Sequence, residues 1–358
     1  MTRSRLVLIV SATVVALGVM VALGALYFDS ARAAVGPLPG EGLLLPADTQ
    51  FVMGVDVKRL VASPVWERYA SRQSMRPEAL QKLEKWTGLD PARDIDQIVV
   101  AGRGRTGKKQ AQPLVMAMGS FDLQKLGFSL DKAEGGTTSE FEGATLFTME
   151  QKGESSSLAL LDTRTVLFGP TERVEAVVAS RSRGETPLEQ NTGLLELVAS
   201  VKPGSTFWMV GDKGLLAGMP QGIPAPGMGG SGTSATMNLP PLQSLILTGD
   251  LGPQLSLALT GVAADDEAAT KLADVVRGLV ALMSLQAQQK PELAELASAF
   301  NISTETNRVL ISARIPYELL EALQPKKKDE PAQVTPEAEE SEETSAEASA
   351  DAAEATPE

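Results

Sequence analysis

The segment IVVAGRGRTGKK at residues 98–109 contains G-x-x-x-x-G-K, the spacing of a nucleotide-binding P-loop. In a P-loop, backbone amides at a helix N-terminus bind phosphate, the lysine reaches the β- and γ-phosphates, and a following Ser or Thr binds magnesium. Lys109 occupies the Ser/Thr position, and the residues from Pro113 onward have the pattern of a strand. We therefore predict a basic hairpin loop between two strands, with no nucleotide bound.

A second catalytic pattern, S-x-x-K, occurs at residues 129–132, where Lys132 is spaced to activate Ser129 as a nucleophile. The S-D-N and K-T-G motifs that accompany it in such enzymes are absent, and the match lies in a polar, loop-like stretch. We interpret it as a chance match.

Clusters of carboxylates offer the remaining chemistry, because Asp and Glu serve as general acids and bases or as calcium ligands. One cluster comprises Asp90, Asp94 and Asp96, and another comprises Asp265 and Asp266. The Asp-Pro step at 90–91 is typical of a turn, and residues 265–266 open an expected helix whose dipole favours negative charge. We expect structural roles for both clusters.

Asp56 and Asp212 each follow the first expected strand of two similar segments. Each carboxylate is expected to cap the segment that follows it, which explains why Asp occurs at both positions. A shared ligand role is the alternative.

The chain of 358 residues contains no cysteine and no histidine. This composition excludes thiolate nucleophiles, disulfides, Cys- or His-ligated metals and every catalytic triad built on an imidazole. We therefore assign no catalytic, cofactor-binding or metal-binding residue and expect no cofactor. An enzyme that relies on Asp, Glu, Ser or Lys alone is the alternative.

Residues 1–33 have the composition of a cytoplasmic stub and a membrane anchor. Residues 6–28 carry no charge, and at about 1.5 Å per residue they are long enough to cross a hydrocarbon core of about 30 Å. Because Arg3 and Arg5 precede them, the positive-inside rule places the rest of the chain outside the cytoplasm. We expect an uncleaved transmembrane signal anchor in the lipid bilayer of a bacterial inner membrane. Cleavage after Ala33 is the alternative.

Residues 325–358 contain eleven acidic residues and three lysines, a large part of the formal net charge of −13. Val334 is the one apolar residue larger than alanine in this segment, so the segment cannot bury enough surface to offset chain entropy. We expect a disordered acidic tail. No basic patch in the chain predicts nucleic-acid binding.

Between a linker at 34–44 and this tail, the sequence contains an internal repeat. TQFVMGVDVKRL at 49–60 resembles STFWMVGDKGLL at 205–216, and three further pairs follow in the same order: 97–102 with 244–249, 112–119 with 254–261, and 165–178 with 308–323. We infer two diverged copies of one unit, at 45–200 and 201–324.

Hydrophobic periodicity predicts the elements of each copy. Strands are expected at 50–57, 97–103, 113–119, 144–151, 157–162, 165–169, 206–211, 242–248, 254–262, 301–306 and 309–315, and helices at 64–72, 77–87, 171–181, 191–201, 265–288 and 316–323. The Gly/Pro/Ser-rich residues 219–241 are expected to form a long loop. The expected fold is α+β: a transmembrane helix, then a duplicated antiparallel sheet with helices on one face.

Two stretches resemble a group of uncharacterised bacterial membrane-anchored envelope proteins, a domain-of-unknown-function family. The first, at residues 43–60, has the family's L-P-A-D-T-x-x-F start, and the second, at 86–102, has a G-L-D-P-x-x-D-I-D turn before a strand. The resemblance implies an exported α+β module and assigns no activity or site.

These features together predict an extracytoplasmic, non-catalytic binding or scaffold protein of the cell envelope. We expect its affinity to come from sheet edges, a groove between the two copies, or the 219–241 loop, with another envelope protein as partner. The alternatives are a carboxylate- or Ser/Lys-dependent hydrolase and a structural spacer that presents the acidic tail.

Overall fold

The computed structural model describes residues 36–70, 90–104, 113–122, 136–151, 153–217, 222–224, 236–238, 240–285 and 291–323. The expected membrane anchor, the helix at 77–87 and the acidic tail lie outside the described residues. Within them, no helix is both long and apolar enough to cross a membrane.

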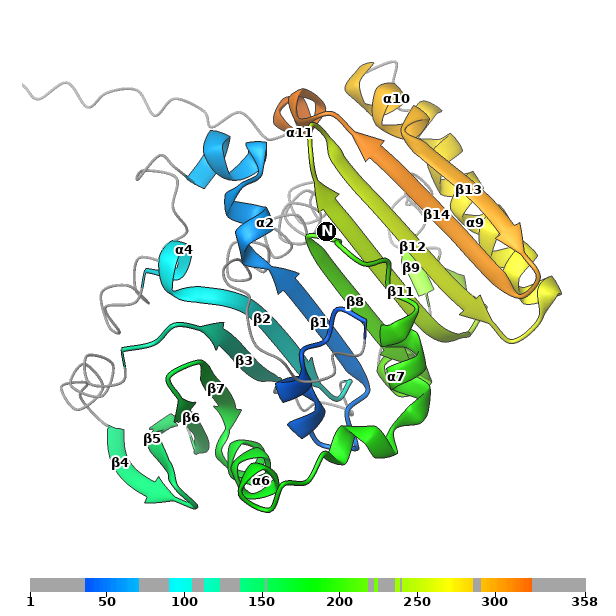
Figure 1. The fold of residues 1–358 in the computed structure, drawn as a ribbon. Helices are drawn as coiled ribbons and strands as arrows, with labels where there is room; N and C mark the ends of the chain where they lie inside the picture. Colours follow the sequence, from blue (N-terminus) through cyan, green and yellow to red (C-terminus); the bar gives the residue numbers. More distant parts are fainter. Residues whose placement is uncertain are drawn as a thin grey trace, which may run out of the picture. The chain divides into compact units, whose positions relative to one another are not determined.

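Fourteen strands are described in this part of the chain (Figure 1). They are β1 (Phe51–Asp56), β2 (Ile95–Gly102), β3 (Leu114–Gly119), β4 (Gly136–Phe141), β5 (Ala144–Gln151), β6 (Glu154–Asp162), β7 (Thr165–Pro170), β8 (Phe207–Asp212), β9 (Gly222–Pro224), β10 (Thr236–Asn238), β11 (Leu242–Leu251), β12 (Leu255–Ala263), β13 (Phe300–Glu305) and β14 (Arg308–Ile315).

The helical elements alternate with these strands. They are η1 (Gly40–Leu44), α2 (Val57–Val61), the π-helical turn η2 (Trp66–Ala70), α4 (Pro91–Asp94), α6 (Thr171–Ser182), η4 (Pro187–Gln190), α7 (Thr192–Ala199), α8 (Lys213–Ala217), α9 (Asp266–Leu285), α10 (Pro291–Ser298) and α11 (Tyr317–Leu323).

Twelve of the strands form one antiparallel sheet in the order β13-β14-β12-β11-β8-β1-β2-β3-β7-β6-β5-β4 (Figure 1). The expected fold is therefore wrong: the repeated segments share one sheet, and the described part of the chain contains no transmembrane helix. The sheet is continuous because β1 and β8 pair with each other. Neither strand forms an edge, because β1 also pairs with β2 and β8 also pairs with β11.

Strands that match in sequence occupy matching positions on the two sides of this central pair. β1 is followed outward by β2, β3 and β7, and β8 by β11, β12 and β14. Met53 lies directly opposite Met209, and Phe51 and Val55 face Gly211 and Phe207. The register is therefore the same when the two strands are exchanged, so the central pair has local two-fold symmetry.

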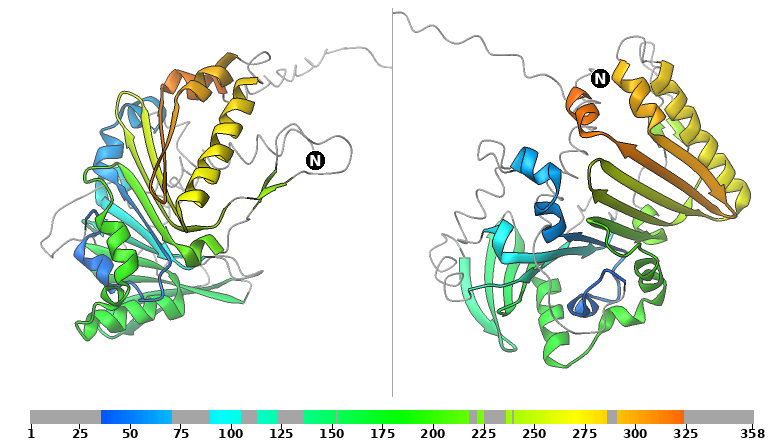
Figure 2. Two further views of the ribbon diagram at one scale, coloured as in Figure 1. Left: turned by 90° about the vertical axis from the view of Figure 1, so that its right-hand side faces the viewer. Right: turned by 45° about the horizontal axis from the view of Figure 1, so that its top comes forward.

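Helices lie on both faces of the sheet, which corrects the expectation of one covered face (Figure 2). The face that we call the α6 face carries η1, α6 and η4 over the first half of the sheet and α7 against β8. The opposite face, the α9 face, carries α2 and α4 over the first half and α9 and α11 over the second. The expected apolar stripe of α9 packs through Leu272, while Val276, Leu279 and Met283 are half-buried.

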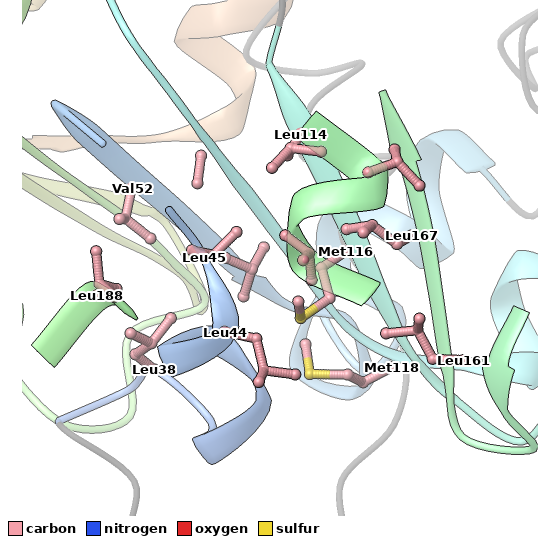
Figure 3. Packing of buried hydrophobic residues seen from close by; sticks show 14 of the residues in the cluster. Leu38, Leu44, Leu45, Val52, Leu114, Met116, Met118, Leu161, Leu167 and Leu188 are labelled. Carbon is pink, nitrogen blue, oxygen red and sulfur yellow. The ribbon is translucent and has the colours of Figure 1, made fainter. Parts of the chain in front are cut away.

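The largest hydrophobic cluster lies on the α6 face, over the first half of the sheet and β8 (Figure 3). Leu114 and Met116 of β3 and Leu167 of β7 meet Leu38 and Leu44, which come from the segment expected to be a linker. Leu38 is completely buried. Residues 37–44 thus add to the core that holds the sheet.

Within the segment 219–241, β9 and β10 form a separate antiparallel pair. Part of the expected loop is therefore a hairpin, and most of its remaining residues lie outside the described part of the chain.

Candidate functional site

The P-loop-like segment lies between two antiparallel strands, as expected. β2 ends at Gly102, β3 begins at Leu114, and the two strands pair directly. The amide of Gly104 donates a hydrogen bond to Gln50 Oε1 at 2.8 Å. The element that begins at Leu114 is a strand rather than a helix, and the hairpin interpretation is confirmed. Residues 105–112 and the S-x-x-K match at 129–132 lie outside the described residues.

The carboxylates at 90–96 stabilise the start of β2. Asp90 Oδ1 accepts a hydrogen bond from the Ala92 amide at 2.9 Å and so caps α4. Asp94 accepts one from the Asp90 amide at 2.7 Å. Asp96 is buried, 3.8 Å from a guanidinium nitrogen of Arg164. These contacts support the structural interpretation of the cluster.

Asp56, Asp212 and Asp265 are helix caps, which is the role predicted for the first two. Asp56 Oδ1 accepts a hydrogen bond from the Arg59 amide at 3.0 Å, and Asp212 Oδ1 accepts one from the Gly214 amide at 2.7 Å. Asp265 accepts one from the Ala268 amide at 2.8 Å at the start of α9. Each carboxylate satisfies backbone donors that the first turn of a helix leaves open.

The L-P-A-D-T segment joins elements from distant parts of the chain. The Asp48 carboxylate forms ion pairs with two guanidinium groups. One is that of Arg173 in α6, at 3.1 Å, and the other is that of Arg103, just after β2, at 3.3 Å. Asn191, which caps α7, donates hydrogen bonds to the carbonyls of Ala47 and Thr49 at 3.1 and 2.8 Å. This motif therefore has a structural role that its sequence did not reveal.

A hollow of about 200 Å³ lies beside the β4–β5 turn. Its polar groups bond to one another or to the adjacent backbone: Ser182 donates to Glu142, and Arg181 donates to the Leu161 carbonyl and to Asp162, both at 2.5 Å. Within the described residues, no group of three His, Cys, Asp or Glu side chains is arranged to hold a metal.

The α9 face carries a row of apolar side chains that crosses ten strands. Each member lies directly opposite the next across a strand pair. From β6 to β13 the row consists of Leu158, Phe168, Val115, Val100, Met53, Met209, Leu247, Leu259, Ile311 and Ile302. At about 4.8 Å per strand it extends for roughly 40 Å. We call it the apolar row.

The apolar row is only partly buried. Phe168 is 41% exposed, and the other nine members are of intermediate exposure. Val100, Val115 and Leu158 pack against the cluster that includes α2, and Ile302 and Ile311 pack against the cluster under α9. The middle of the row, from Met53 to Leu259, lies between these two clusters. This region is the candidate functional site.

The sequence contained a signal for the apolar row in the alternation of apolar residues along each expected strand. The alignment of those residues across strands depends on register, which single-strand periodicity does not provide. The row was missed for this reason.

Comparison with known proteins gives a distant structural similarity. No family model and no curated protein matches the chain. Crystal form III of TP0453 matches with a TM-score of 0.47 and 12% identity over 82% of this chain and 98% of that one. Crystal form I matches with a TM-score of 0.44 and 12% identity over 83% and 98%, and crystal form IV with 0.43 and 13% over 78% and 93%. At these scores the similarity carries no functional argument.

Proposed function

We propose that the protein is a non-enzymatic binding or scaffold protein of the bacterial cell envelope. The middle of the apolar row, centred on Met53 and Met209, is its binding surface. The partner is an apolar or amphipathic segment of another envelope protein.

The observation that carries this proposal is the continuity of the apolar row. Ten consecutive strands place an apolar, incompletely buried side chain at the same level of one face. Extended apolar surface of this kind is typical of interaction sites. Methionine at the centre suits such a surface, because its flexible, polarisable side chain adapts to different partners.

The polar chemistry of the described residues supports binding over catalysis. The carboxylates that sequence patterns singled out cap helices or pair with arginine. None of these contacts places a nucleophile beside a base, which is the arrangement that covalent catalysis needs.

Photocrosslinking in the native envelope tests the proposal. A photoreactive phenylalanine analogue is placed at Met209, in the apolar row, and in a control at Ala258, which is exposed on the opposite face of β12. We expect a protein adduct from position 209 and none from position 258. Equal adducts from both positions, or none from either, contradict the proposed surface, and an adduct with lipid alone contradicts a protein partner.

A further inference from the structure

A cluster of three charged side chains connects two elements that are 250 residues apart. Arg68 of η2 contacts Glu318 of α11 through both terminal guanidinium nitrogens, each at 3.2 Å, and contacts Glu321 at 3.4 Å. The side chains are 42%, 72% and 45% exposed. The contact joins the segment that follows β1 to the last described helix of the chain.

The cluster contains two negative charges and one positive charge. Glu318 and Glu321 are three residues apart on α11, so their carboxylates repel each other when no cation lies between them. Arg68 lies within 3.4 Å of both. Removal of the Arg68 charge therefore breaks two ion pairs and also leaves two like charges together. Its loss should have a larger effect than the loss of one partner of an isolated surface pair.

The backbone that carries Arg68 is unusual. η2 is a π-helical turn, a geometry that is rare and often found where function requires it. It follows Ser63, whose hydroxyl accepts a hydrogen bond from the Trp66 amide at 3.2 Å. η2 begins after α2 has ended at Val61, and it carries the arginine that contacts α11.

Apolar side chains from both sides meet beneath the charged cluster. Val65 and Trp66 pack with the cluster that includes α2, and Leu320 packs with the cluster under α11. Leu255 and Leu257 of β12 pack against both clusters. We call these five residues the apolar seam. Surface ion pairs contribute little stability and are screened by salt, so the ion pairs of this cluster weaken as the salt concentration rises.

We propose that Arg68, Glu318 and Glu321 form a salt-sensitive latch that holds α11 against η2 and keeps the apolar seam closed. The latch regulates access to the α9 face at the end of the sheet where α11 lies. This inference goes beyond the proposed function, because it requires no particular partner.

Distance measurements between spin labels test the latch in the full chain. The sequence has no native cysteine, so Ala62→Cys and Ala322→Cys, both at exposed positions, provide the two labels. At low salt we expect a narrow distance distribution. Salt at about 1 M, which screens charges beyond roughly 3 Å, or the substitution Arg68→Glu, shifts the distribution to longer and broader distances.

A charge exchange separates an ionic latch from simple packing of the Arg68 side chain. The double variant Arg68→Glu/Glu318→Arg restores the narrow distribution if the contact is ionic. The control Lys271→Glu disrupts a more exposed pair within α9, Lys271–Glu267 at 2.6 Å, and leaves the distance unchanged. An unchanged distribution in Arg68→Glu overturns the latch, and so does a lengthened distribution that the charge exchange fails to restore.

Discussion

Close contact between Gly54 and Trp208 shows how single residues determine the centre of the sheet. The two residues lie opposite each other in β1 and β8, on the α6 face. Trp208 is 2% exposed, and a Cβ added at Gly54 would lie 2.4 Å from its indole nitrogen. The absence of a side chain at position 54 is what allows the indole to cover the junction of the two halves.

We therefore expect Gly54→Ala to destabilise the fold by about 1–3 kcal/mol, the usual cost of overpacking a core. The measurement is urea unfolding followed by tryptophan fluorescence. Gly278→Ala is the matched control, because Gly278 lies in α9, where an added Cβ would have open space within 4 Å. That control should be neutral or stabilising by up to about 1 kcal/mol. Equal stability of the two variants would contradict the packing described for Trp208.

The raised pKa of Tyr317 leads us to expect a loss of folding stability in alkaline solution. Its hydroxyl donates a hydrogen bond to the Gly252 carbonyl at 2.9 Å, and burial raises its pKa from 10.0 to about 12. The unfolded chain therefore releases this proton first. The contribution of the group to stability is fully present below pH 10 and is lost as the pH rises toward 12, by at most about 1.4 kcal/mol per pH unit.

The variant Tyr317→Phe isolates this effect. It should lose roughly 1 kcal/mol at neutral pH, because the Gly252 carbonyl no longer has its donor. Between pH 10 and 12 its stability should fall less steeply than that of the parent chain. Parallel curves of unfolding free energy against pH for the two proteins would show that Tyr317 does not titrate as proposed.

At the scale of elements, Asn191 determines where α7 begins and what it packs against. Its Oδ1 accepts a hydrogen bond from the Leu194 amide at 3.2 Å, while its amide group donates to the carbonyls of Ala47 and Thr49. One side chain thus caps a helix and attaches that helix to the L-P-A-D-T segment.

Asn191→Ala should cost about 1–3 kcal/mol, since it removes the cap and leaves two carbonyls without this donor. Asn191→Asp is the matched variant, because a carboxylate keeps the cap acceptor and lacks the donor. We expect an intermediate loss for it in thermal or urea unfolding. If Asn191→Asp has the same free energy of unfolding as the parent chain, the contacts to the L-P-A-D-T segment contribute nothing to stability.

Most strands were predictable from sequence because each contains a run of apolar residues bounded by turn residues. β5, expected at 144–151, has those bounds, and β3, α6 and α9 begin within one residue of their expected starts. β4 was missed because GTTSEF is polar and lies at the edge of the sheet, where no buried face imposes apolar alternation. The helix α10 was missed as well.

At the scale of the whole molecule, the sequence predicted the repeated segments but not how they meet. The pairing of β1 with β8 joins residues about 150 positions apart, and local periodicity contains no information about such a partner. The absence of histidine and cysteine excluded imidazole and thiol chemistry. The apolar row and the Arg68 cluster emerged only when strand register and long-range contacts were known.

The single sheet also gives the proposed function its physical basis. Because the two halves share one sheet, the apolar side chains of β1 and β8 continue those of β2 and β11 without interruption. Two separate sheets would have divided this surface. We therefore expect a partner in the envelope to cover the middle of the apolar row.

Protection of a single thiol tests that claim most directly. Met209→Cys and, as a control, Ala258→Cys each introduce the sole cysteine of the chain, and their alkylation rates are compared in the purified protein and in the native envelope fraction. We predict that the thiol at 209 reacts in the purified protein and is protected in the envelope, while the thiol at 258 reacts equally in both. Equal reaction of the thiol at 209 in both preparations would contradict the account.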